Sequence, residues 1–199
     1  MIKLIIFDFD DTLADSKNVR YEMDTNAAKK LGLKPVSERK YFKYYGTPYR
    51  KLIKELYPDI SVNKFIDVAS DFYELDKFRL FPKTEEILLY LKDRNYKLAI
   101  LSSEEGPELK TLLKHLKIQH YFDYVHAKED SEHYKPDPKV FDDILDRFKL
   151  KKSEVAYVGD LPIDRDAAIS AGIFFIGINH CPKEGIMWTD SIEGLKKIF

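Results

Sequence analysis

The chain has 199 residues, which is room for one full domain or for a core domain with a modest insertion. Hydrophobic residues make up 44% of it, enough for a sizeable core, so we do not expect a disordered chain. Its 33 basic and 34 acidic residues leave a formal net charge of -1, which gives no general attraction to nucleic acid or to anionic lipid.

No stretch approaches the roughly 20 apolar residues that a membrane span needs, and the apolar run at the start of the chain is too short for a signal peptide. The only cysteine is Cys181, so no intramolecular disulfide can form, and we expect a structural or surface thiol there. The sequence therefore predicts a soluble, cytoplasmic protein that binds neither nucleic acid nor membranes, as a monomer or a small homo-oligomer.

The first predicted element is a short buried strand at Leu4–Phe7, followed directly by two aspartates in the segment FDFDDTL. Side chains alternate along a strand, so Asp8 and Asp10 are expected to point the same way. Two carboxylates so close repel each other, and a hard, oxygen-seeking ion such as Mg²⁺ would relieve that repulsion. The plainer alternative is an acidic turn that caps the following helix.

Residues 16–80 contain no convincing buried strand and are predicted to be helical. The expected helices are Lys17–Leu31, Glu38–Tyr45, Tyr49–Tyr57 and Val62–Phe78, separated by Gly32, Gly46-Thr47-Pro48 and Pro58-Asp59. We therefore expect a helical domain of residues 16–80, inserted into a core domain of residues 1–15 and 81–199.

Beyond residue 80, amphipathic helical patterns alternate with short apolar runs. The helix faces are marked by Ile87, Leu88 and Leu91, by Leu109, Leu112, Leu113 and Leu116, and by Val140, Phe141, Ile144, Leu145 and Phe148. The predicted strands are Leu98–Leu101, Val155–Val158 and Phe174–Ile178, with a weaker candidate at Tyr121–His126. This alternation predicts an α/β fold with a doubly wound parallel sheet.

Polar side chains follow two of these elements. Ser102 ends the second strand, and its hydroxyl and the next backbone amides could hold a phosphoryl oxygen, although Ser102 or Ser103, taken alone, fits a cap of the next helix better. Lys135 precedes a proline and would offset nearby carboxylates and bind a phosphate, unless it is a surface lysine before a helix start.

The last such feature is the segment VGDLPIDRDAA, in which Asp160 follows a buried strand and Asp164 comes four residues later. Asp160 is well placed to bind a metal, with Asp164 as an auxiliary ligand, although both could be loop and helix-cap residues. The carboxyl edge of an open parallel sheet is where ligands bind, so all four features are expected to meet there.

In this order, the four features resemble the haloacid dehalogenase-like hydrolase superfamily, whose motifs are DxDx[TV], a Ser or Thr after a hydrophobic strand, a Lys, and GDxxxD. The chain reads DFDDT at Asp8–Thr12, LAILS at Leu98–Ser102, YKPDP at Tyr134–Pro138 and GDLPID at Gly159–Asp164. The resemblance covers nearly the whole chain and is closest to phosphoglycolate phosphatase-like proteins. It implies a Rossmann-like core with a helical cap of the C1 type, inserted between the first two motifs.

The resemblance also implies roles for individual residues. Asp8 is expected to attack phosphorus and form an aspartyl-phosphate, and Asp10 to act as the acid and base. Mg²⁺ is expected as the cofactor and a small phosphorylated metabolite as the substrate. The metal ligands implied are Asp8, Asp10 through its backbone carbonyl, Asp160 and Asp164, and the phosphate-binding residues are Thr12, Ser102, Ser103 and Lys135.

Four alternatives stay open at this stage. A phosphomutase of the same fold would need dedicated acid/base residues in its cap, and a dehalogenase would lack the second aspartate, Asp10. A phospho-receiver domain fits poorly with the long insertion, and a non-catalytic binding module fits poorly with four intact motifs. The cap sets specificity in this family, and the residues expected to line its site are Arg20, Lys43, Tyr45, Thr47 and Arg50, which could also be solvated surface.

Overall fold

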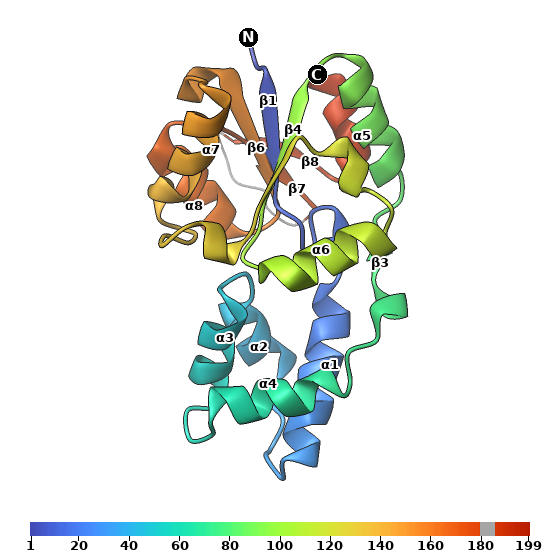
Figure 1. Ribbon diagram of the computed structural model, residues 1–199, viewed down its shortest axis with the longest axis vertical. Helices are drawn as coiled ribbons and strands as arrows, with labels where there is room; N and C mark the ends of the chain where they lie inside the picture. The colour runs from blue at the N-terminus through green and yellow to red at the C-terminus, as the bar shows by residue number, and fades with distance from the viewer. Residues whose placement is uncertain (180–185) are drawn as a thin grey trace.

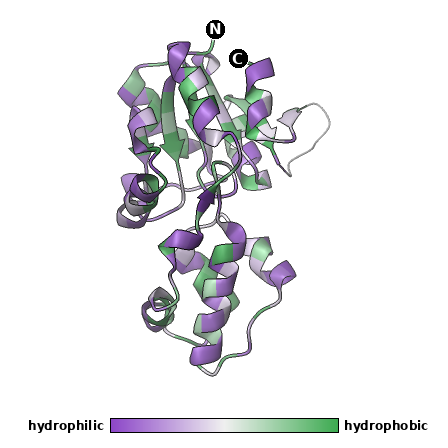
Figure 2. Ribbon diagram, turned by 90° about the vertical axis from the view of Figure 1, so that its right-hand side faces the viewer, coloured by the Kyte–Doolittle hydropathy of each residue, from purple (hydrophilic) through white to green (hydrophobic). Residues whose placement is uncertain are grey.

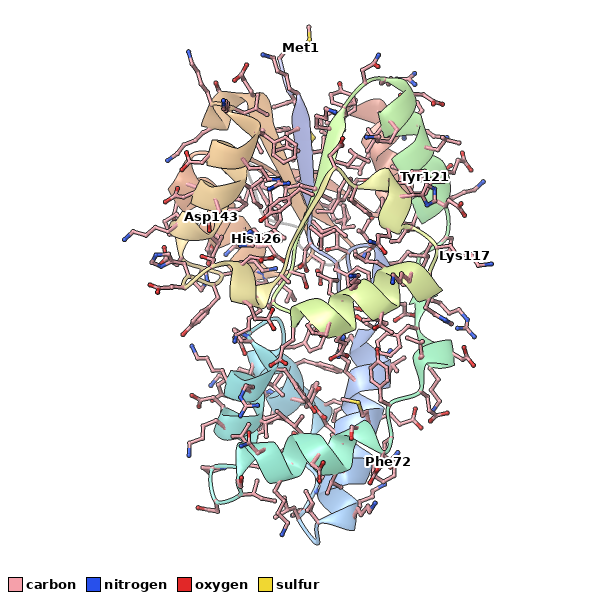
Figure 3. The ribbon with its side chains drawn as sticks, in the orientation of Figure 1. Met1, Phe72, Lys117, Tyr121, His126 and Asp143 are labelled. Carbon is pink, nitrogen blue, oxygen red and sulfur yellow. The ribbon has the colours of Figure 1, made fainter. Side chains whose placement is uncertain are left out.

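The computed structural model describes residues 1–179 and 186–199, so the predicted role of Cys181 lies outside the described residues. The chain forms two bodies, an α/β core and a helical cap, with both termini at the end of the core away from the cap (Figure 1). In the view with side chains, Met1 marks that end and Phe72 lies within the cap (Figure 3).

The core is built on a six-stranded, fully parallel sheet in the order β5-β4-β1-β6-β7-β8. The central strand is β1, with Leu4 opposite Lys97 of β4 and Val155 of β6. Because the order places the first strand in the middle, the chain winds outward in both directions, as predicted. The strands are β1 (Leu4–Phe7), β4 (Lys97–Leu101), β5 (Tyr124–His126), β6 (Val155–Gly159), β7 (Phe174–Ile178) and β8 (Met187–Thr189).

Alternate residues of the strands fill two cores, one on each face of the sheet. Ile5 and Phe7 face a cluster completed by α5 (Thr84–Asp93) and α6 (Gly106–His115). Leu4 and Ile6 face the opposite cluster, which the other two helices of the core cover. Those helices are α7 (Asp142–Phe148) and α8 (Pro162–Ala171). The apolar strands lie between helices whose outer faces are hydrophilic (Figure 2).

The cap contains four helices with an apolar core of their own, which includes Tyr41, Ile53 and Phe65. They are α1 (Lys17–Lys30), α2 (Glu38–Tyr44), α3 (Tyr49–Leu56) and α4 (Val62–Ser70). The cap joins the core through two short antiparallel strands, β2 (Ala14–Asp15) and β3 (Arg79–Leu80). The predicted domain boundaries fall at the ends of these two strands, and the division itself stays a prediction.

The sequence misjudged the end of the cap. The helix predicted to continue to Phe78 ends at Ser70, because the chain must turn back toward the core. Phe78 is buried in the core cluster, with its ring centroid 5.4 Å from that of Tyr73. The periodic pattern over residues 62–78 therefore covers two features, the helix α4 and a separate aromatic residue, Phe78, that packs in the core.

No helix in the described ranges is long and apolar enough to cross a membrane.

Candidate active site

The site lies where three neighbouring strands end, at the edge of the sheet that faces the cap. Asp8 follows β1, and its backbone N–H donates to Val158 O over 2.9 Å, which continues the ladder to β6. Ser102 follows β4, and its N–H donates to His126 O over 3.0 Å. Asp160 follows β6. Residues 152 positions apart in the sequence thus meet because their strands are adjacent.

Lys135 is the centre of the polar contacts. Its side chain is buried, and its Nζ donates to Oδ1 of Asp8 over 2.8 Å and to Oδ1 of Asp164 over 2.7 Å. Burial alone would lower the pKa of Lys135, but the charges of Asp164 and Asp8 raise it above its usual value. The lysine is therefore held as an ammonium ion among carboxylates, as the sequence predicted for a charge-offsetting lysine.

Tyr157 belongs to the same network and was missed at the level of sequence. Its hydroxyl donates to Oδ1 of Asp164 over 2.9 Å and accepts from Lys135 Nζ over 3.2 Å. The run VAYV predicts only a buried strand. The available signal was the hydroxyl itself, because a buried tyrosine needs a hydrogen-bond partner.

Asp164 is held on three sides, because its Oδ2 also accepts from the N–H of Leu161 over 3.0 Å. Gly159 makes this packing possible. A Cβ on Gly159 would lie 2.7 Å from the Cβ of Asp164, closer than real carbon atoms approach. The GDxxxD motif therefore packs glycine against its second aspartate, and that aspartate fixes the lysine.

Three buried carboxylates could hold a cation. Oxygen atoms of Asp8, Asp160 and Asp164 lie within 4.8 Å of one another. Burial is the largest cause that raises the pKa of Asp8 to about 8, and burial with the charges of Asp164 and Asp8 raises the pKa of Asp160 well above its usual value. Lys135 offsets only one of the three charges, so the set fits a divalent ion with oxygen ligands. The side chain of Asp10 lies outside this group.

The predicted phosphate-binding hydroxyls all lie near the carboxylates but have different partners. Thr12 Oγ1 donates to Oδ1 of Asp160 over 3.0 Å, and Ser102 Oγ accepts from the N–H of Glu104 over 3.1 Å. Ser103 Oγ donates to Gly46 O of the cap over 2.8 Å. Ser103 thus joins core to cap in this closed form. A phosphate-binding role for the three hydroxyls stays a prediction.

Arg20 is buried at the junction of cap and core, among three acidic side chains. Its Nε donates to Oδ1 of Asp10 over 3.3 Å, and its Nη1 donates to Oε1 of Glu108 over 3.0 Å. Its Nη2 lies 3.0 Å from Oε2 of Glu104, an ion pair without hydrogen-bond geometry. Burial raises the pKa of Glu104 most; Arg20 opposes this, while Asp10 and Glu108 add to it.

A small pocket lies between these groups and the cap. It leaves about 30 Å³ for the centres of water-sized molecules, and its lining includes Asp8, Asp10 and Lys135 from the core. Of the five predicted cap residues, Arg20, Tyr45 and Thr47 line the pocket. Lys43 and Arg50 are exposed and do not, since Lys43 lies over the Tyr44 ring and Arg50 contacts Asn63. Glu104 and the aromatic lining residues Tyr41 and Tyr49 were not predicted.

Comparison with known proteins gives consistent results. A family model described as haloacid dehalogenase-like hydrolase matches residues 5–178. A phosphorylated carbohydrates phosphatase of Thermotoga maritima is 27% identical over 92% of this chain and 88% of the relative, and a phosphoglycolate phosphatase of Vibrio cholerae is 28% identical over 90% and 85%. The crystal structure of a predicted phosphoglycolate phosphatase from Haemophilus somnus, 24% identical, has a TM-score of 0.90 with 99% of this chain and 97% of that chain covered, which supports the fold.

Proposed function

Because the chain belongs to the haloacid dehalogenase-like hydrolase family, we propose that it is a Mg²⁺-dependent phosphatase that hydrolyses small phosphomonoesters through an aspartyl-phosphate on Asp8. The single observation that carries the proposal is the buried ion cluster at Asp8. Its carboxylate is bound by Lys135 over 2.8 Å and lies beside Asp160 and Asp164, with oxygens of all three within 4.8 Å of one another. The names of the relatives support the phosphatase activity.

In the proposed reaction, a carboxylate oxygen of Asp8 forms a bond to phosphorus while the bond from phosphorus to the leaving oxygen breaks. Asp10, which faces the pocket, gives its proton to that leaving oxygen. Asp10 then takes a proton from water, the water oxygen attacks phosphorus, and the Asp8 carboxylate is released as inorganic phosphate forms. Lys135, Ser102 and the backbone amides after β4 bind phosphoryl oxygens, which stabilises their charge.

Mg²⁺ would be held by Asp8, Asp160 and the backbone carbonyl of Asp10, and when bound it supplies positive charge that offsets the phosphoryl oxygens. Asp164 serves a different purpose in this proposal. Both of its oxygens accept hydrogen bonds, from Lys135, Tyr157 and Leu161, so it orients the lysine. Thr12 donates to Asp160 and fixes the position of that ligand.

The contacts of Asp10 favour hydrolysis over phosphoryl transfer between sugar hydroxyls. A phosphomutase needs a proton-transferring group in its cap, and the cap side chain that binds Asp10 is Arg20. A guanidinium stays protonated in proteins and cannot act as a base. Phosphate release, rather than an isomeric sugar phosphate, is therefore the expected outcome.

The proposal is tested by phosphate release from p-nitrophenyl phosphate in the presence of Mg²⁺. We expect activity that is lost on thorough chelation with EDTA and restored by Mg²⁺, and we expect Asp8→Asn to abolish turnover with an unchanged circular dichroism spectrum. Asp15→Asn, at the exposed end of β2, is the matched control and should keep activity. Substantial turnover by Asp8→Asn would remove Asp8 as the nucleophile, and activity without metal would remove the metal role.

A further inference from the structure

The relatives named above differ in the charge of the leaving group. Hydrolysis of phosphoglycolate releases an alcohol that carries a carboxylate, whereas hydrolysis of phosphorylated carbohydrates releases neutral polyols. The sequence identities to the two relatives, 27% and 28%, are too similar to favour either kind of substrate. We infer that the leaving group of this enzyme is uncharged and hydroxylated, as in a small phosphorylated carbohydrate or polyol. The inference rests on the proposed phosphatase function and concerns the cap side of the same pocket.

The charge balance around Arg20 carries the inference. Recognition of a substrate carboxylate requires a cation that is free to pair with it. Arg20 is the cation on the leaving-group side of the pocket, next to Asp10, and its three nitrogens already face Asp10, Glu104 and Glu108 at 3.0 to 3.3 Å. Even with Glu104 protonated, and with Asp10 carrying the proton that it gives to the leaving oxygen, Glu108 still pairs with the guanidinium of Arg20 at 3.0 Å. A carboxylate entering this side would meet like charge without a partner.

No other cation takes that place within the described part of the chain. The second basic residue in the pocket lining is Lys135, which is bound to Asp8 and Asp164 at the phosphoryl end. The nearby cap lysines lie outside the lining. Lys17 Nζ is 4.6 Å from the centroid of the Phe42 ring, and Lys43 Nζ is 5.2 Å from that of Tyr44.

The remaining lining suits a neutral polyol. Tyr41, Tyr45 and Tyr49 give aromatic surface with hydroxyl groups, and Thr47 adds a further hydroxyl. The hydroxyls of Tyr41 and Tyr49 both donate to Asp24, over 2.7 and 2.6 Å, so the carboxyl of Asp24 holds these two rings in place. Apolar surface with a few fixed polar groups is the usual composition of a site for a small molecule, and here the cap side of the lining adds no free cation to it.

The test compares two matched pairs of esters that differ only in a terminal hydroxymethyl or carboxylate group. The pairs are 2-hydroxyethyl phosphate with 2-phosphoglycolate, and glycerol 3-phosphate with 3-phosphoglycerate. We expect kcat/KM for phosphate release, with the full chain and Mg²⁺, to favour the neutral member of each pair by about 100-fold, because juxtaposed like charges cost several kcal/mol.

Variants test the cause of this preference. Glu104→Gln and Glu108→Gln each remove one acidic partner of Arg20, so its guanidinium can pair with a substrate carboxylate. In both variants, the ratio of kcat/KM for the neutral ester to kcat/KM for the carboxylate ester should fall by roughly 10-fold. The control is Glu105→Gln, which makes the same change between these two positions and should keep the wild-type ratio. If a variant does not fold, the kcat/KM ratios of the wild-type protein still test whether the leaving group is uncharged.

The two levels of the proposal fail differently. Equal or faster turnover of the carboxylate esters overturns the neutral leaving group and leaves the phosphatase function intact. An unchanged ratio in both glutamate variants overturns the role of the Arg20 cluster in that preference. Absence of phosphate release from all four esters and from p-nitrophenyl phosphate overturns the proposed function, and the inference with it.

Discussion

Lys135 connects three parts of the fold through a single ammonium group. It binds Asp8 at the end of β1, Asp164 at the start of α8 and the Tyr157 hydroxyl on β6. A buried carboxylate without such a partner is strongly destabilising. Lys135 therefore favours the ionised form of Asp8 against the effect of burial, which still raises the pKa of Asp8 to about 8, and its three contacts hold the strand ends together.

Tyr157→Phe tests this network with a minimal change. The ring still packs against Phe141 and Phe175, but Asp164 loses a donor. We expect the free energy of unfolding to fall by about 1.5 to 3 kcal/mol, as for a lost hydrogen bond to a charged group, and kcat to fall roughly 10-fold. Urea denaturation and phosphate release measure the two effects.

The control for this substitution is Tyr124→Phe, whose hydroxyl has a weak contact of 3.4 Å to His126. It should lose less than half of the stability lost by Tyr157→Phe and should keep kcat. Equal losses in the two variants would contradict a special role for the Tyr157 hydroxyl.

At the residue scale, the sequence predicted which residues lie together where each of them follows a strand or belongs to a short motif. Asp8, Lys135, Asp160 and Asp164 were named together, and they do lie together. It could not place Arg20 among Asp10, Glu104 and Glu108, because those contacts depend on how the cap docks onto the core. Neither the period of a helix nor the alternation of a strand carries that information.

At the scale of elements, the buried strands were predicted almost to the residue. Each is a short apolar run between polar ends, and burial on both faces forces that pattern. The edge strand β8 was not predicted. Its three residues, Met187–Thr189, are partly exposed, so they do not form an apolar run. Strands β2 and β3 have two residues each, too few for any periodicity.

Three cap helices meet at Asp24 of α1. It accepts hydrogen bonds from Tyr41 of α2 and Tyr49 of α3, over 2.7 and 2.6 Å. Burial is the largest cause that raises the pKa of Asp24 from 3.8 to about 6, while both tyrosines and Arg20 lower it. Asp24 therefore binds a proton more tightly in the folded protein than in the unfolded chain, despite its hydrogen bonds to the two tyrosines.

The raised pKa of Asp24 makes the stability of the protein depend on pH. Between about pH 4 and pH 6 the folded state holds a proton that the unfolded state has lost, so Asp24 makes stability fall as pH rises through that window. Asp24→Asn removes this titration. Its stability relative to wild type should rise by up to roughly 3 kcal/mol from pH 4 to pH 7, because a tenfold change in proton affinity is worth about 1.36 kcal/mol.

Denaturant titrations at several pH values measure the difference. Asp67→Asn, at an exposed position of α4, makes the same chemical change and should give a difference that does not vary with pH. A constant difference for Asp24→Asn as well would show that Asp24 is ionised throughout, with the tyrosine hydrogen bonds outweighing burial.

Across the whole molecule, the cap is closed over the site. The pocket between cap and core is small, with about 30 Å³ for the centres of water-sized molecules, so we expect the cap to open when a phosphorylated compound enters. Closure rests on Arg20, on the hydrogen bond from Ser103 to Gly46 O, and on Leu161, which packs against the cap core.

Gly46→Ala tests the closed arrangement. Gly46 has a φ of 86°, and a Cβ there would lie 2.4 Å from Cδ1 of Leu161 and 2.9 Å from Cδ1 of Ile163. Displacing the terminal methyl groups of these two side chains weakens the contact between cap and core, so kcat/KM should fall about 2- to 3-fold, with closure needed to position the reacting groups. Steady-state kinetics with p-nitrophenyl phosphate measures the loss.

Gly32→Ala is the matched control, because Gly32 has a φ of 71° and nothing within 4 Å of an added Cβ. Both variants carry the same backbone strain, about 1 to 2 kcal/mol of stability. Only Gly46→Ala should also lose activity. Equal kinetics in the two variants would mean that the contacts of Gly46 do not govern closure.

The pairing of β2 with β3 has a consequence for how far the cap can change in length. Ala14 pairs with Leu80 and Asp15 with Arg79, so the two chain segments that lead into the cap leave the core side by side. To the core, residues 16–78 are a loop already closed at its base, and the entropy of such a loop grows only with the logarithm of its length. Insertions and deletions within residues 16–78 are therefore expected to leave the register of β1 against β4 unchanged.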